Sequence, residues 1–262
     1  MMKSGQENNT SDQPHKLTTL LEGFAPISIK EMDGVALMNR RDTKFILTRE
    51  NLEALLTDIQ THYRVLDING DRIHEYKTIY SDTRNFRFYN DHHRGKRGRI
   101  KIRTRSYVGS GLHFLEIKQK NKTGDTNKTR MKTESLESHL SQQHMDFIEE
   151  VIGERPELIP VLYSSFSRIT LVGINSPERI TIDTDIDFND KGPIAKGSEK
   201  LVIVEVKQSK QNRSSAMVQA LRAHKIRPLS ISKYCIGLSS KHPHLKRNSF
   251  KRKYLKINKT LG

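Results

Sequence analysis

The chain has 262 residues, enough for one large domain or two small ones with a substantial core. Its formal net charge of +16 predicts an anionic partner, which can be nucleic acid, an acidic membrane surface or a phosphate polymer. The single cysteine, Cys235, excludes a disulfide framework and a thiolate zinc site. No apolar run approaches the roughly 20 residues of a spanning helix, and residues 1–16 lack the apolar stretch of a secretory signal. We therefore expect a cytoplasmic protein.

The first part of the chain changes from polar to patterned. Residues 1–16 are rich in Ser, Asn, Gln and Asp and are expected to be a disordered lead-in, followed by a short mixed segment. A strand is predicted over residues 42–47. Thr48 then caps a predicted helix whose apolar face consists of Leu52, Leu55, Leu56 and Ile59.

Short segments of alternating polarity follow, separated by turn-prone glycines and prolines, and we predict that each is a strand. They cover residues 74–81, 99–107, 113–120, 163–172, 179–186 and 201–208, and helices are predicted over 141–152 and 214–225. This pattern indicates an α+β fold with enough antiparallel strands to close a β-barrel.

The charged faces of these strands are unusual. Residues i and i+2 of a strand share a face, so Arg99, Lys101, Arg103 and Arg105 lie opposite Ile100. The same alternation predicts a charged face on four later strands. Their charged residues are, in order, Glu116, Lys118 and Lys120; Arg168; Arg179, Asp183 and Asp185; and Glu205 and Lys207. A solvated outer face is the simpler interpretation of any single strand. Because like charges across a ladder destabilise it, their repetition favours a bound anion, and Arg and Lys suit phosphate.

The carboxylates Glu116, Asp183, Asp185 and Glu205 refine this expectation. A groove that only binds polyanions has no use for them, whereas Mg²⁺ or Mn²⁺ takes carboxylate oxygens together with substrate phosphates. Cations beside a carboxylate-held metal suit phosphoryl transfer. The alternative for each acid is a salt bridge; for Glu116 both interpretations stay open, and for Glu205 we favour the metal.

The segment Ile102-Arg103-Thr104-Arg105-Ser106-Tyr107, followed by Phe114-Leu115-Glu116-Ile117-Lys118, resembles the VTC-type polyphosphate polymerase domain. Further matching pieces occur in the same order, among them Asp42-Thr43-Lys44-Phe45, Lys128-Thr129-Arg130, Phe166-Ser167-Arg168, Val204-Glu205-Val206-Lys207 and Ser232-Lys233-Tyr234. The family belongs to the triphosphate tunnel metalloenzymes, also called CYTH-like. The resemblance implies an antiparallel tunnel of about eight strands, lined by charged residues, with helices packed outside.

The resemblance also implies roles for individual residues. Catalytic tunnel cations would be Lys44, Arg103, Arg105, Lys118, Arg168 and Arg179, and substrate would contact Lys128, Arg130, Lys120, His92, Ser232 and Lys233. Glu205 matches the family's metal-binding glutamate, and Glu116, Asp183 and Asp185 are our further metal candidates. The implied reaction transfers the γ-phosphate of ATP to a polyphosphate chain with Mn²⁺ or Mg²⁺.

Some positions depart from the family pattern. Asn90, Asp91 and His92 stand where the eukaryotic pattern has an arginine after its tyrosine pair, and His92 is the candidate replacement. The Glu-x-Glu-x-Lys opening of hydrolytic tunnel enzymes is not met, because Arg40 and Arg41 precede Asp42-Thr43-Lys44. A polymerase is therefore favoured over a triphosphate hydrolase. A third alternative, a nucleic-acid-binding protein, is disfavoured because aromatic residues make up only 6% of the chain and there is no Trp.

We expect three regions: a polar N-terminal lead-in over 1–34, the tunnel domain over 35–240 and a basic tail over 241–262. For the tail, a disordered, solvated charge run is the favoured interpretation. The alternative is contact with a membrane protein, acidic lipid or exiting polyphosphate, since each cation near an anionic surface adds about 1 kcal/mol. The expected location is thus cytoplasmic, with membrane association as the alternative.

Overall fold

A computed structural model describes residues 13–33, 41–121, 126–188, 200–209, 212 and 214–262. Its centre is a strongly curved sheet in the order β2-β10-β9-β8-β4-β5-β6-β7, with neighbouring strands antiparallel. These strands are β2 (Arg41–Leu47), β4 (His74–Asp82), β5 (Ile100–Tyr107), β6 (Leu112–Lys120), β7 (Thr126–Thr133), β8 (Ile159–Gly173), β9 (Glu178–Asp187) and β10 (Val202–Gln208). Two short strands, β1 (Ala25–Ile27) and β3 (Tyr63–Leu66), extend one end of β8.

The predicted α+β fold with an eight-stranded antiparallel sheet is confirmed, but the sheet is unclosed: within the described ranges β2 and β7 do not pair. The sheet nevertheless curls. Four strands separate β2, which carries Lys44, from β5, which carries Lys101, yet the charge of Lys101 acts on Lys44. We call the side of the sheet that carries Lys44, Arg103 and Arg168 the inner face.

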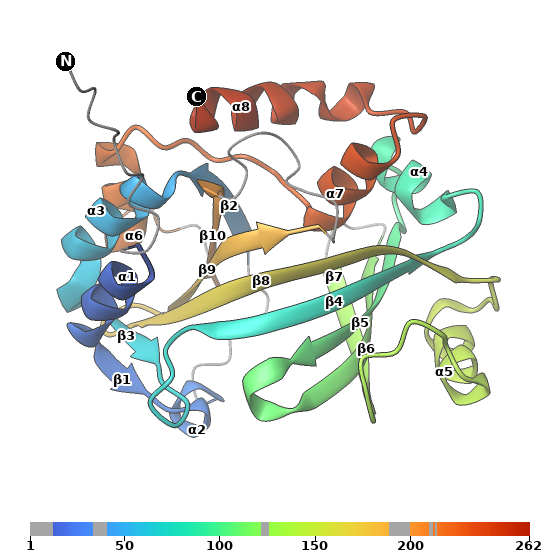
Figure 1. Cartoon of the computed structure of the whole chain (residues 1–262), viewed down its shortest axis with the longest axis horizontal. Helices are drawn as coiled ribbons and strands as arrows, with labels where there is room; N and C mark the ends of the chain where they lie inside the picture. Colours follow the sequence, from blue (N-terminus) through green and yellow to red (C-terminus); the bar gives the residue numbers. More distant parts are fainter. Residues whose placement is uncertain (1–12, 34–40, 122–125, 189–199, 210–211, 213) are drawn as a thin grey trace, which may run out of the picture.

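The opposite, outer face is apolar and is covered by helices at both ends (Figure 1). At one end α1 (Gln13–Glu22), α3 (Arg49–Ile59) and α6 (Ala216–Ala223) pack on β2, β8, β9 and β10. At the other end α5 (Gln142–Ile152) and α4 (Arg87–His93) pack on β5 and β6. Ile102 and Leu115 are fully buried there, as their alternation with the charged residues predicts. Helix α2 (Ile29–Asp33) follows β1.

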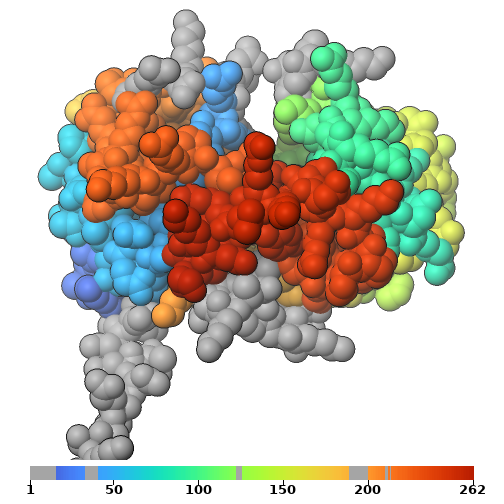
Figure 2. Space-filling view, turned by 90° about the horizontal axis from the view of Figure 1, so that it is seen from above, coloured from blue at the N-terminus to red at the C-terminus, as the bar shows by residue number. Residues whose placement is uncertain are grey.

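The C-terminal region differs from the expected disordered tail. Helix α7 (Lys233–Lys241) ends next to the predicted domain boundary, and α8 (Lys251–Leu261) follows it. Both pack on the inner-face side of the sheet, because Tyr234, Phe250 and Ile257 share one apolar cluster with Tyr80 and other strand residues. Figure 2 shows the red C-terminal segment lying between the orange segment that precedes it and the green α4 region. Buried apolar residues therefore hold this C-terminal segment on the sheet, although its charge had predicted a disordered, solvated tail.

The N-terminal lead-in is also shorter than predicted. Residues 1–12 lie outside the described residues, but α1 begins at Gln13, and Leu17, Leu21 and Phe24 are buried in the core against α3. Their spacing of four and three residues is that of a helix face, which the polar flanks obscured. No helix among the described residues is long and apolar enough to cross a membrane.

Candidate functional site

Three carboxylates of the inner face each lie between two cations. Glu116 pairs with Arg103 and Lys128, Asp183 with Arg168 and Lys233, and Glu205 with Lys44 and Lys207. Each group therefore carries one net positive charge. Strand register produces this pattern: Glu116 lies opposite Arg103 on one side and Arg130 on the other, and Glu205 lies opposite Lys44.

The group around Glu116 is the most buried of the three. The carboxylate is fully buried, and the Arg103 Nε atom donates to its Oε2 atom at 2.8 Å. Burial opposes ionisation, but the charges of Arg103, Arg105 and Lys128 hold the pKa of Glu116 below its ordinary value. The salt-bridge interpretation of Glu116, left open by the sequence, is the one realised in the structure.

The group around Asp183 combines charge with aromatic rings. Arg168 donates two hydrogen bonds to Asp183, at 2.6 and 2.9 Å, and Lys233 from α7 binds the same carboxylate. Tyr76 and Phe166 stack with ring centroids 5.2 Å apart. The guanidinium of Arg168 lies 5.0 and 5.1 Å from the two centroids, and Lys233 lies 4.2 Å from that of Phe166. Cation–π contacts with these rings hold Arg168 and Lys233 in place.

The group around Glu205 is the most accessible. Its side chain is 17% exposed, against 0% for Glu116 and 6% for Asp183. Lys207 lies 3.0 Å from the second carboxylate oxygen. Burial lowers the pKa of Lys44 to about 7; the charge of Asp42 raises it, and the charges of Lys207, Lys101 and Lys233 lower it further.

Two further inner-face cations have no acidic partner among the described residues. Arg105 is buried and donates from Nε to the Thr78 hydroxyl at 3.1 Å, with its guanidinium 5.5 Å from the centroids of Tyr76 and Phe166. Burial and the charges of Arg103 and Arg105 lower the pKa of Lys118 well below its ordinary value. Buried cations that repel one another are costly in the absence of an anion.

A cavity of about 240 Å³ opens where α7 and α8 meet β5 and β6. We call it the basic cavity; its lining includes Arg99, Lys101, Lys118, Lys120, Lys253, His92 and Ser232, and no acid. Ser232 caps α7 by accepting from Cys235 N, and its hydroxyl also accepts from Lys101 Nζ at 3.0 Å. The predicted residues Lys118, Lys120 and Ser232 are thus brought together.

His92 lines the same cavity but is not an additional cation. One ring nitrogen, Nε2, lies 3.0 Å from the carbonyl oxygen of Ile100. Burial, together with the charge of Lys101, lowers the pKa of His92 to about 3, so the ring is neutral at physiological pH. It cannot replace the charge of the arginine that the family pattern has nearby.

Three predicted residues lie away from the groups around the carboxylates. Asp185 has a positive φ of 49°, which breaks the alternation with Asp183, and its half-exposed carboxylate binds Arg49 of α3 at 2.7 Å. Arg179 donates to the carbonyl oxygen of Met32 at 3.1 Å. Arg130 is exposed on the edge strand β7 and lies 4.6 Å from the ring centroid of Phe114. Asp185 therefore does not belong with the other acids.

The sequence analysis missed a buried carboxylate, Asp82, at the end of β4. It accepts hydrogen bonds from the backbone N–H groups of Phe88 and Tyr89, at 2.9 and 3.0 Å, and from the Tyr234 hydroxyl. Through these bonds Asp82 joins α4 to α7, which carries Lys233. Nothing in the alternation of β4 distinguishes this residue from a surface acid.

The family model of the VTC domain matches residues 39–242 of the chain. The chain belongs to the VTC domain family. No curated protein sequence matched this VTC domain. The predicted resemblance is therefore confirmed at the level of the family.

Solved structures agree with this VTC domain in fold. A suggested adenylate cyclase from Bacillus halodurans is 12% identical with a TM-score of 0.51, covering 74% of this chain and 96% of that one. A suggested adenylyl cyclase from Hippeastrum, described as having a dominant triphosphatase activity, is 12% identical with a TM-score of 0.51, covering 80% of this chain and 98% of that one. At such identity the likeness shows the fold alone.

Proposed function

We propose that this VTC domain is a metal-dependent polyphosphate polymerase, which transfers the γ-phosphate of ATP to a growing polyphosphate chain. The observation that carries the proposal is the excess of cations on the inner face. Glu116, Asp183 and Glu205 are each already paired with two cations, and Arg105 and Lys118 are additional basic side chains. A phosphate chain supplies the anions that this arrangement needs.

The proposed roles follow from position. Arg103, Arg105 and Arg168 would bind non-bridging phosphate oxygens, since a guanidinium presents paired donors to them. Lys44, Lys118, Lys128 and Lys233 would serve as point charges along the chain. Because phosphoryl transfer depends mainly on alignment and charge neutralisation, these side chains need only hold donor and acceptor phosphates in line. A bound phosphate would compete with each carboxylate for its two cations.

Fewer of the candidate carboxylates are available to a divalent metal than the sequence analysis expected. The described residues contain no cluster of three acidic, histidine or cysteine side chains that could hold an ion. Mg²⁺ needs only one or two protein carboxylates when phosphates and water complete its shell. Glu205, which is more exposed than Glu116 and Asp183, fits that requirement. When bound there, Mg²⁺ or Mn²⁺ would neutralise phosphate charge.

Product analysis tests the proposal. The purified chain is incubated with ATP and Mn²⁺, and its products are separated on a gel. We expect ADP and an acid-labile polymer. Free phosphate as the only product would instead indicate a triphosphate hydrolase, and no consumption of ATP without nucleic acid would favour a nucleic-acid-binding protein.

A second experiment tests the metal assignment. Glu205→Gln should lower Mn²⁺ binding, measured from the spin-resonance signal of free Mn²⁺ with tripolyphosphate present. Turnover should fall at least about 10²–10³-fold, while binding of long polyphosphate persists because two lysines are released. Asp185→Asn is the matched control, since Asp185 binds Arg49 outside the inner face. Normal turnover of Glu205→Gln at limiting Mn²⁺ would refute the assignment.

Contact of α8 with an anionic membrane or a membrane partner also stays a proposal. The helix contains five basic residues, no acidic residue, and Leu255, which is 58% exposed. Sedimentation with vesicles containing phosphatidylserine, compared with neutral vesicles, would detect this contact.

A further inference from the structure

A second cavity lies on the opposite side of β2 from the inner face. Its volume is about 400 Å³, and its lining includes Thr43 and Phe45 of β2 together with residues of α6 and the segment after it. Lys44, between these two residues, points to the inner face, where it binds Glu205. Because side chains alternate along a strand, this α6 cavity is separated from the inner face by the sheet itself.

Three cations converge on the α6 cavity. Arg222, Lys225 and Arg227 line it, and no acid is among the lining residues. None of the three forms an ion pair with a described residue, whereas eight other arginines of the described fold do. All three are exposed and can reach a ligand without breaking an internal contact. The charge of this cavity therefore selects an anion.

The floor of the α6 cavity is apolar. Phe45 is 4% exposed and belongs to the apolar core on the outer face of the sheet. Val218, Ile226 and Pro228 complete the apolar lining. The backbone is fixed here: Phe45 bridges to Pro228, and Leu229 N donates to Lys44 O at 2.8 Å. An inorganic phosphate would use only the cations. A phosphate attached to a ring would also cover the apolar floor, and the volume is within the roughly 300–1,000 Å³ of small-molecule sites.

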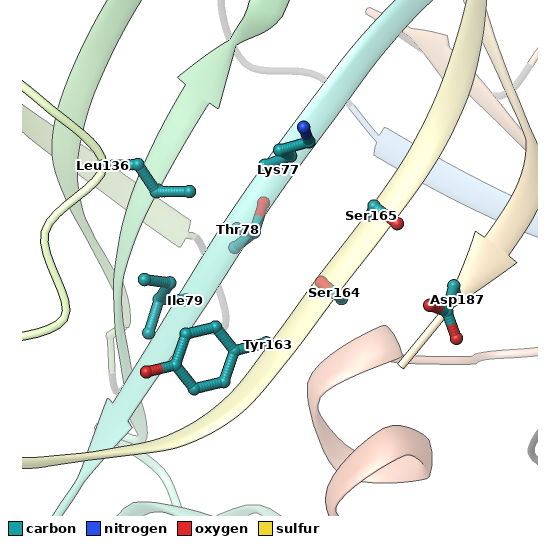
Figure 3. A pocket seen from close by; sticks show the side chains of 8 residues that line it. All are labelled: Lys77, Thr78, Ile79, Leu136, Tyr163, Ser164, Ser165 and Asp187. Carbon is teal, nitrogen blue, oxygen red and sulfur yellow. The ribbon is translucent and has the colours of Figure 1, made fainter. Parts of the chain in front are cut away.

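A contrasting cavity on the outer surface shows that this charge is not general. The cavity between β4 and β8, shown in Figure 3, has a volume of about 220 Å³. Its lining contains one cation, Lys77, and one acid, Asp187, together with Tyr163 and three further hydroxyl-bearing residues. Its formal charge is balanced, so it gives no reason to expect an anion. In Figure 2 the orange segment that contains α6 lies beside the red C-terminal segment.

We propose that the α6 cavity, formed by Arg222, Lys225 and Arg227 over the Phe45 floor, is a second binding site for a small organic phosphate. The phosphate binds the three cations and the attached ring packs on the apolar floor. This site is independent of the inner-face reaction and of its substrate.

AMP is a suitable probe, and its binding is measured by calorimetry at low salt. We expect the Arg222→Ala/Arg227→Ala double variant to bind AMP at least about tenfold more weakly, because two charged contacts are lost. Its affinity for tripolyphosphate should not change. Arg105→Met should behave in the opposite way, keeping AMP binding and losing tripolyphosphate binding. Lys77→Ala is the control for removal of an exposed cation from the other cavity.

Inorganic phosphate tests the apolar floor and should bind at least about tenfold more weakly than AMP, since burial of a ring adds to affinity. The proposal is overturned if wild-type protein does not bind AMP at millimolar concentration, or if the double variant binds AMP normally. Equal affinity for AMP and inorganic phosphate would overturn the assignment to organic phosphates. Unchanged thermal melting of the double variant excludes misfolding as the cause of lost binding.

Discussion

Arg105 and Arg103 occupy the same face of β5 but differ in their partners. Arg103 binds the buried Glu116, so its removal leaves that acid with one cation fewer. Arg105 has only the Thr78 hydroxyl and the faces of two rings. Arg105 is buried among like charges and has no acidic partner, so it stabilises the fold no more than an apolar side chain would. We therefore assign it to ligand binding.

We predict that Arg105→Met lowers tripolyphosphate affinity by about 10- to 100-fold, the range for a lost hydrogen bond to a charged group. The free energy of unfolding should stay unchanged or rise, because repulsion with Arg103 is relieved. Calorimetric titration and urea unfolding measure the two effects. Arg168→Met is the comparison: it should lose both binding and stability, since Asp183 keeps only Lys233. Loss of stability in Arg105→Met with intact binding would contradict the assignment.

His92 should make the stability of the fold depend on pH. Its pKa is lowered to about 3 in the folded state, so below its ordinary value of 6.5 the unfolded chain binds a proton that the folded chain does not. Stability should therefore fall as the pH decreases from about 7 towards 3, by at most about 1.4 kcal/mol per pH unit from this group. Urea unfolding of His92→Gln should show a shallower dependence between pH 7 and 5. An unchanged slope would show that His92 is not neutral in the fold.

The inner-face cations of β5 were predictable from alternation alone, because strand geometry assigns Arg103, Arg105 and Ile102 to their faces without further information. What each acid binds was not predictable. Glu116 and Asp183 are salt-bridged: the pairing of β7 with β6 brings Lys128 to Glu116, and α7 brings Lys233 to Asp183. Asp185 was misassigned because its positive φ interrupts the period of two. Asp82 depends on contacts with α4 and α7 that are distant in sequence.

Most elements with a one-sided apolar pattern were predicted, α1 being an exception, and β7 and α8, which lack a clear one, were missed. Helix α3 has the predicted buried face and the predicted Thr48 cap. Strand β7 is exposed at all but two of its eight positions, so it has no apolar face that would reveal it. Helix α8 is ordered by few buried residues within a basic sequence. In both cases tertiary neighbours, rather than local pattern, decide the structure.

Helix α8 allows a matched test of this view. Ile257 is 1% exposed against the inner-face cluster, whereas Leu255, two residues earlier, is 58% exposed. We predict that Ile257→Asp detaches α8, because an unpaired charge in an apolar contact costs several kcal/mol. Limited trypsin digestion should then cut at Lys251 to Lys253 much faster than in wild type. Leu255→Asp should leave the digestion rate unchanged, and equal protection of both variants would show that α8 is held by other contacts.

The cations of the inner face extend over strands from β2 to β7 and onto α7, which is more positive charge than one triphosphate neutralises. A hydrolase of small triphosphates has no use for the surplus, whereas an enzyme that holds a long product does. We therefore predict that affinity rises with phosphate chain length, and that it falls with salt more steeply for a long chain than for tripolyphosphate, because a longer chain displaces more counterions. Fluorescence competition at several salt concentrations measures both slopes.

Lys118→Ala should reduce the long-chain slope by about one, as expected for one lost phosphate contact, and Lys77→Ala, outside the inner face, should not change it. Equal affinity and equal slopes for tripolyphosphate and a long chain, with free phosphate as the only product from ATP, would establish the hydrolase instead.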